Sequence, residues 1–181
     1  QKQYINSNTP SVFYNTSITE QNVGNTMKRV TTNQYDETNH NPYPISTTGQ
    51  TIDLTNSTSS EPITISKVYD QYGDVTAATD AKGNTTTYTY ITKNNLELLD
   101  SESKPIDSNH TLFIKYFYND QGSITEVQYR DHDINGTLLK KVDYSNFDSY
   151  GNAQNETITD QQGKTTQVSF AYGSQYQGAY L

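Results

Sequence analysis

The chain carries the segment YDQYGDVTAATDAKGNTTTYTY at residues 69–90 and a related segment, FDSYGNAQNETITDQQGKTTQVSFAY, at residues 147–172. The first half of the unit recurs after 78 residues (69 to 147) and the second half after 80 (80 to 160). A weaker third copy lies near residues 116–144, with YNDQG at 118–122 and DINGT at 133–137. Repetition of this kind indicates that one supersecondary unit is built several times.

Each copy combines strand-forming residues with turn-forming glycines. Runs rich in Thr, Tyr, Ile and Val at residues 85–90, 112–118 and 165–172 favour β-strands, because these side chains suit a pleated, half-buried surface. Glycine beside Asn, Asp or Ser supplies the positive φ that tight hairpin turns require. Residues 94–102 fit either a helical turn or an irregular strand. We therefore predict an all-β protein, in which repeated antiparallel β-hairpins form a curved strip of sheet.

The recurring positions of the repeat predict structural roles. In each unit the glycine reverses the chain, and the aspartate before it accepts hydrogen bonds from turn amides. The aromatic ring that starts each copy is expected to stack on the equivalent ring of the next hairpin. The residues with these predicted roles are Tyr69, Asp70, Gly73, Asp80, Gly83, Tyr88, Tyr90, Tyr118, Gly122, Asp133, Gly136, Phe147, Asp148, Gly151, Asp160, Gly163 and Phe170.

The composition indicates how such a chain is stabilised. Its 181 residues suit one domain or a run of small units, and a hydrophobic content of 31% excludes a thick aliphatic core. Sixteen tyrosines supply large rings instead, which favours an ordered chain. A single two-stranded hairpin is marginal in water, so the hairpins are expected to pair edge to edge with neighbouring repeats of the same parent chain.

The first third of the chain departs from the repeat. Residues 1–65 are predicted to be a divergent β-rich segment with a long loop near residues 38–62, where Pro, Gly and Ser gather. Residues 23–25 and 35–36 resemble eroded remnants of the repeat. The hairpins themselves are placed in residues 66–181.

Charge and cysteine content exclude several classes of protein. The net charge of −8 disfavours binding to nucleic acid or to anionic membrane surfaces. No stretch approaches the roughly 18 consecutive apolar residues of a membrane helix, so we predict no membrane insertion. The absence of cysteine excludes disulfides, thiolate zinc sites and cysteine nucleophiles, and it fits a Gram-positive exported protein. The predicted location is secreted or associated with the bacterial cell wall.

Catalytic and metal-binding motifs give no support to an enzyme. The sequence lacks a nucleophile elbow and a phosphate loop, and its three histidines, His40, His110 and His132, are far apart. We predict no catalytic residue, no cofactor and no bound metal. The segment DHDING at residues 131–136 matches the opening of a calcium loop, but the twelfth position is Val142 rather than glutamate. A hairpin turn is the favoured interpretation, and calcium at Asp131, Asp133 and Asn135 stays open.

The repeat resembles that of a known family. An aromatic-Asp-x-x-Gly element, followed by Asp-x-x-Gly-x-Thr-Thr and alternating aromatics, is similar to the YD repeat of Rhs proteins. That family includes Rhs toxins, insecticidal toxin-complex subunits, teneurins and Bacillus wall-associated proteins, and the resemblance covers about residues 66–175. It implies a non-catalytic structural segment of a large exported bacterial protein, in which a β-shell encloses or presents a toxin domain.

A carbohydrate-binding or cell-wall-binding adhesion module is the alternative. In that case the tyrosine faces would form a platform for sugar rings, with Asp and Asn binding the hydroxyls, and the partner would be a cell-wall glycan. Aromatic residues at strand spacing favour packing over a ligand platform.

Overall fold

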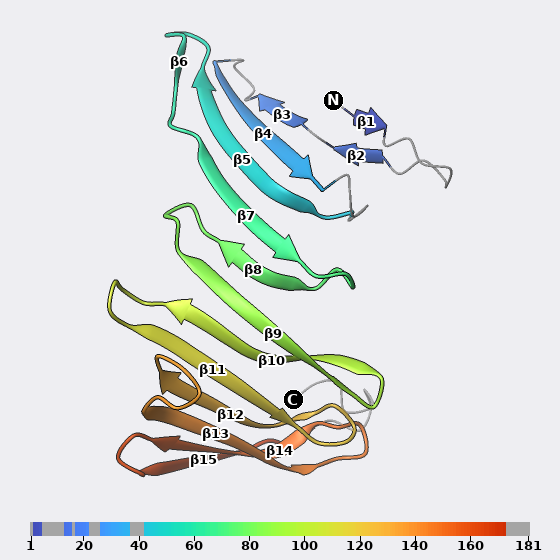
Figure 1. The fold of residues 1–181 in the computed structure, drawn as a ribbon, viewed down its shortest axis with the longest axis vertical. Helices are drawn as coiled ribbons and strands as arrows, with labels where there is room; N and C mark the ends of the chain where they lie inside the picture. Colours follow the sequence, from blue (N-terminus) through green and yellow to red (C-terminus); the bar gives the residue numbers. More distant parts are fainter. Residues whose placement is uncertain (1, 5–12, 16, 22–25, 37–41, 173–181) are drawn as a thin grey trace. The chain divides into compact units, whose positions relative to one another are not determined.

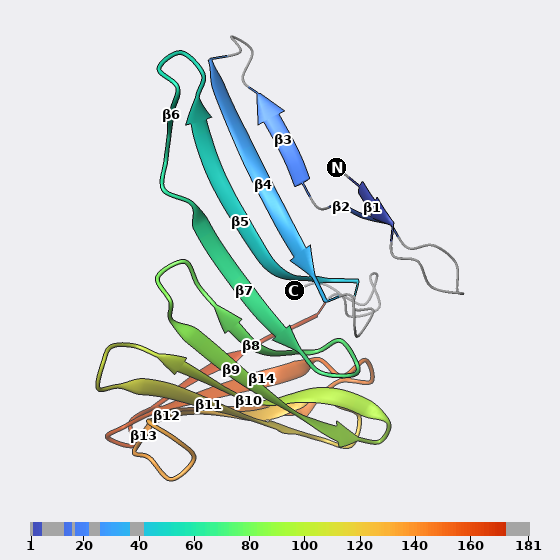
Figure 2. The same cartoon turned by 45° about the horizontal axis from the view of Figure 1, so that its top comes forward.

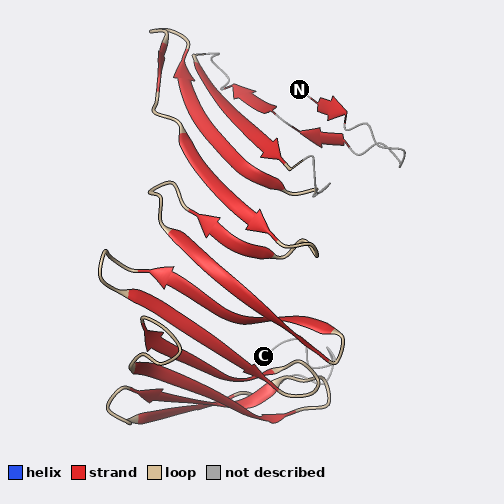
Figure 3. Cartoon of the chain, viewed as in Figure 1, coloured by secondary structure: helices blue, strands red, loops and turns tan. Residues whose placement is uncertain are grey.

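The computed structural model describes residues 2–4, 13–15, 17–21, 26–36 and 42–172. These residues form strands, turns and connecting loops without a helix (Figure 3), so none of them belongs to a helix that could cross a membrane. Up to residue 85 the strands are β1 (Lys2–Tyr4), β2 (Phe13–Asn15), β3 (Ser17–Gln21), β4 (Met27–Tyr35), β5 (Pro44–Asp53), β6 (Thr58–Ser59), β7 (Ile63–Tyr69) and β8 (Val75–Thr79). The remaining strands are β9 (Thr85–Lys93), β10 (Leu96–Pro105), β11 (Thr111–Tyr118), β12 (Ile124–Asp131), β13 (Leu138–Phe147), β14 (Ala153–Asp160) and β15 (Thr165–Ser169).

Hydrogen bonding joins thirteen of these strands into one antiparallel sheet whose order follows the chain, from β3 to β15. Strand β6 pairs only with β5, and β1 and β2 form a separate pair. In the described part of the chain the sheet is open, because β3 and β15 are its two ends. The prediction of an all-β protein built from antiparallel hairpins is confirmed.

The chain divides into two compact units, residues 1–85 and 86–181. This division does not test the predicted boundary at residue 65, which concerns where the repeats begin. In the first unit, β4, β5 and β7 lie side by side and bend along their length (Figures 1 and 2). The possible repeat remnant at residues 23–25 lies outside the described residues.

Strand β5 corrects the predicted long loop at residues 38–62. It pairs with β4 along its whole length and with β7 from Ser46 to Gly49, so Gly49 is held by ladders on both sides. Pro44 is tolerated because it is the first residue of the strand. Side chains reinforce both ladders, since the Thr48 and Thr64 hydroxyls lie 2.8 Å apart and Thr47 Oγ1 donates to Asn33 Oδ1. Outside β5, the described residues of this range are 42–43, which form a bend, and 54–62, which hold a turn and β6 and resemble the predicted connector.

The core of the second unit is small and lies across three adjacent strands. Ile114 on β11, Val127 on β12 and Val142 on β13 are buried, and Val127 directly faces Val142 in the sheet. Half-buried neighbours complete the core: Leu112, Tyr116, Tyr129, Tyr144 and Ile158. Three of these five are tyrosines, which fits the expectation that large rings replace aliphatic side chains.

Strand β10 resolves the ambiguity at residues 94–102 in favour of an irregular strand. Its pairing with β9 shifts between Leu99 and Ser101, which marks a β-bulge. The strand follows a tight turn at Asn94 and Asn95, whose φ angles are 51° and 63°. Positive φ at two consecutive residues is the backbone of a hairpin turn that asparagine tolerates well.

Candidate functional site

The repeated hairpin turns are the most regular feature of the molecule. Five turns share one geometry, and each ends with a glycine three residues after an Asp or Asn. In each turn the N–H of that Asp or Asn donates to the carbonyl four residues later at 2.9–3.0 Å, and the glycine N–H donates back to its carbonyl at 3.0–3.2 Å. The glycine φ angles are 81–92°. These turns begin at Asp70, Asp80, Asn119, Asp148 and Asp160.

The side chain at the start of each turn binds two turn amides. Its Oδ1 atom accepts the N–H groups two and four residues later, at 2.8–3.0 Å in all five turns. The predicted acceptor role is therefore confirmed for Asp70, Asp80, Asp148 and Asp160. Sequence reasoning missed Asn119, which takes the aspartate's place because its amide oxygen is an equivalent acceptor.

Two of these aspartates receive a third hydrogen bond. The side-chain amides of Asn84 and Asn152 donate to Oδ2 of Asp80 at 3.0 Å and of Asp148 at 3.1 Å. The pKa of Asp80 is lowered, first by the side-chain bond from Asn84. The pKa of Asp148 is also lowered, first by the backbone N–H of Asn152. Both shifts arise because hydrogen bonds favour the ionised carboxylate.

These shifts predict an acid-sensitive stability. A folded-state pKa below the ordinary 3.8 stabilises the folded chain above that pH, and the contribution disappears as the pH falls through the folded value. Asp148→Asn should keep the turn, as Asn119 does, but should lose part of this pH dependence. Thermal melts followed by circular dichroism between about pH 7 and pH 2 measure the effect. An equal acid-induced loss of melting temperature in wild type and Asp148→Asn would contradict this prediction. As a control, Asp148→Ala removes the acceptor and should melt at a lower temperature at neutral pH.

The turn at Gly136 is built differently. Asp133 accepts the N–H of Asn135 on Oδ1 at 2.8 Å and the N–H of Gly136 on its carbonyl at 3.0 Å, so its predicted turn role is confirmed. Gly136 itself lacks the positive φ expected of it, and His132 has a φ of 69° instead. Glycine is required here because a Cβ atom would lie 1.5 Å from the Asp131 carbonyl oxygen.

Two of the three rings that start the copies, those of Tyr69 and Tyr118, bind the neighbouring strand through their hydroxyls. Tyr69 Oη donates to the Pro44 carbonyl at 3.2 Å, and Tyr118 Oη donates to the Leu99 carbonyl. Tyr69 also stacks on Tyr43, with ring centroids 5.8 Å apart and planes 24° apart. Because Tyr43 lies outside the repeat, stacking between equivalent rings stays a prediction.

The other aromatic repeat residues occupy strands or strand ends. Tyr88 and Tyr90 are half-buried on one face of β9. Phe147 ends β13 opposite Ala153. Phe170 follows β15, and its N–H donates to the Gln154 carbonyl at 2.8 Å. These positions fit packing roles in a sheet.

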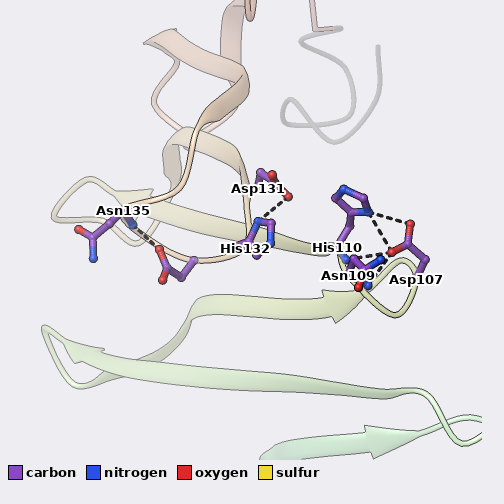
Figure 4. A network of polar contacts seen from close by, with 7 residues as sticks. Asp107, Asn109, His110, Asp131, His132 and Asn135 are labelled. Atoms are coloured by element: carbon purple, nitrogen blue, oxygen red, sulfur yellow. Dashed lines mark hydrogen bonds and ion pairs between the residues drawn. The ribbon is translucent and has the colours of Figure 1, made fainter.

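A polar cluster lies between the loop after β10 and the end of β12 (Figure 4). His110 Nδ1 lies 2.8 Å from Asp107, and His132 Nδ1 lies 2.9 Å from Asp131. The two imidazole rings are 6.1 Å apart, although the sequence separates them widely. Pairing of β11 with β12 brings them together, since Leu112 faces Asp131. Asp107 raises the pKa of His110, first through the side-chain hydrogen bond and then through its charge.

Both histidines of this cluster are more than half exposed. The predicted hairpin turn at residues 131–136 is present, with Asp131 paired to His132 and Asp133 bound to turn amides. Across the described ranges, no three His, Asp or Glu side chains are arranged to hold a metal ion. His40 lies outside those ranges.

Comparison with known proteins gives one coarse likeness. No family model matches the chain, and no curated protein matches it. Among solved structures, it is similar to TcdB2-TccC3 without its hypervariable C-terminal region and to TcdB2-TccC3-Cdc42. Each is 14% identical, with a TM-score of 0.40 and coverage of 97% of this chain. TcdB2-TccC3-TEV is also similar, with a TM-score of 0.37. The chain spans 11% of the length of these proteins, and the assignment to YD-repeat proteins stays a prediction from the motif.

Proposed function

We propose that this chain is a non-catalytic structural segment of a large exported bacterial protein of the YD-repeat type. It forms part of a β-shell that encloses or presents a toxin domain. The observation that carries the proposal is the fivefold recurrence of one Asp- or Asn-capped turn between consecutive strands of an open sheet. A repeated turn sets the same register at each step, as a wall built by adding hairpins requires.

The exposure of β7 supports a wall with two surfaces. This strand pairs with β5 on one side and β8 on the other, yet five of its seven residues are exposed. Ile63 is 61% exposed and Val68 is 58% exposed. Exposed apolar side chains on a strand paired on both sides indicate a surface that further protein covers. In a shell, that cover is the enclosed domain or a neighbouring part of the parent chain.

Cysteine labelling of consecutive residues in β7 tests the proposal. Thr64 and Ile65 are both exposed, and successive strand residues point to opposite faces of a sheet. Thr64→Cys and Ile65→Cys should react alike with a bulky maleimide in the isolated chain, which has no other cysteine. In the full-length parent, the cysteine facing the enclosed space should react at least about tenfold more slowly. Equal rates for both cysteines in the parent would refute an enclosing wall.

A further inference from the structure

A hollow of about 840 Å³ lies in the first unit where β5 and β7 separate. The ladder between these strands ends at the pair Ser46 and Ser66, and the hollow is lined by residues beyond that end and by the turn to β8. Its volume falls within the roughly 300–1,000 Å³ of small-molecule sites. The lining includes three aromatic rings and several polar side chains, among them Tyr43, Tyr69, Tyr72, Lys67, Asp70 and Gln71.

Two of the three aromatic rings of this hollow, Tyr43 and Tyr69, are held in place by contacts with each other and with the backbone. The hydrogen bond from Tyr69 to the Pro44 carbonyl fixes its ring, and Tyr43 stacks on that ring. Gly73 brings the turn backbone against the edge of Tyr43, since a Cβ on Gly73 would lie 3.9 Å from Tyr43 Cε2. Tyr43 is nevertheless 54% exposed and Tyr72 is 74% exposed. Fixed rings bind a ligand with little loss of side-chain entropy.

The polar side chains offer both donors and acceptors. Asp70 Oδ1 binds the N–H groups of Tyr72 and Asp74 within the turn. In the Asp80 and Asp148 turns an asparagine amide occupies Oδ2, but here the corresponding residue is Asp74, which has no amide to donate. Exposed Lys67 adds a cationic donor to the lining. These polar groups, a carboxylate, an ammonium and a glutamine amide, can form hydrogen bonds with the hydroxyl groups of a sugar. The aromatic faces beside them can pack against the C–H face of its ring.

We propose that this hollow binds a short, neutral oligosaccharide. A pyranose ring lies against Tyr72 or Tyr43, and its hydroxyls bind Asp70, Lys67 and Gln71. A net charge of −8 disfavours an anionic glycan. A peptide that adds as a further strand is disfavoured at the place where β5 and β7 separate. Pro44 has no N–H there, and its carbonyl already accepts a hydrogen bond from the Tyr69 hydroxyl. The inference goes beyond the structural role proposed above, and either can fail without the other.

Titration of the full 181-residue chain tests this binding site, with cellotriose, maltotriose and the N-acetylglucosamine trimer as probes. Calorimetry should show saturable binding of at least one of them. Tyr72→Ala should raise the dissociation constant about tenfold or more. Asp70→Asn keeps the turn acceptor but replaces Oδ2 with an amide, and it should weaken binding about fivefold.

Tyr150→Ala is the matched control. Tyr150 occupies the same position of an equivalent turn and is 62% exposed, but it is not part of this hollow. Its removal should change the dissociation constant less than about twofold. Unchanged melting temperatures would show that the variants fold. The proposal would be overturned if none of the three sugars bound saturably, or if Tyr72→Ala and Tyr150→Ala weakened binding equally. Binding of a proline-rich peptide in place of the sugars would also overturn it.

Discussion

Replacing Gly136 with alanine is expected to disrupt the β12–β13 hairpin and to lower the free energy of unfolding by about 3 kcal/mol. The new Cβ would lie 1.5 Å from the Asp131 carbonyl oxygen and 2.7 Å from its carbonyl carbon. Both are backbone atoms, so no side-chain rotation relieves the contact. The loop is also tied by hydrogen bonds from the N–H groups of Asp131 to Thr137 and of His132 to Thr111. Moving the backbone apart therefore breaks part of the turn.

Gly163→Ala provides the control for this substitution. Gly163 has a φ of 81°, and a Cβ added there would meet no atom within 4 Å. Alanine at this position therefore costs only the free energy of a left-handed backbone, roughly 1–2 kcal/mol. Urea unfolding followed by circular dichroism gives both values. A Gly136→Ala chain that is as stable as Gly163→Ala would show that the Asp131 carbonyl does not constrain the loop.

Truncation of Ile114 should destabilise the second unit by a similar amount. Ile114 is 8% exposed and belongs to the core with Val127 and Val142. Removing three carbons from a buried isoleucine costs about 2–5 kcal/mol, because apolar contacts are lost and a cavity remains. We expect about 3 kcal/mol for Ile114→Ala, since half-buried tyrosines beside it can close part of the space.

Ile106→Ala separates the effect of burial from that of residue type. Ile106 lies in the loop after β10 and is 61% exposed, so its truncation should change the free energy of unfolding by less than about 0.5 kcal/mol. Chemical denaturation of both variants measures the difference. Similar losses for the two isoleucines would mean that the three-residue core does not hold the unit together.

Local chemistry explains which parts of the fold could be predicted from the sequence. The aspartate of the motif supplies the acceptor of the turn, and the glycine three residues later supplies the backbone freedom. The motif alone therefore predicts the acceptors Asp70, Asp80, Asp148 and Asp160. Asn119 was missed because the motif was defined by aspartate. The amide oxygen of Asn119 nevertheless accepts the same two N–H groups.

Features that depend on pairing between distant residues could not be predicted in this way. The ladders of β4 and β7 make a strand of residues 44–53, whose proline and glycine resemble a loop when considered alone. The approach of His110 to His132 requires the register of β11 against β12. The stack of Tyr43 on Tyr69 requires both β5 and β7 to be in place. In each case the missing information was a strand register.

The agreement between strand order and chain order has a consequence for biosynthesis. Nearly every strand pairs with the strand made just before it, so contacts are local in sequence and loop closure is cheap. A hairpin forms in roughly 1–10 μs, whereas translation adds only about 5–20 residues per second. Each strand from β8 onward can therefore dock on the strand before it while the next is still being synthesised. Growth of the sheet is expected to be directional, with the newest strand as the template for the one that follows.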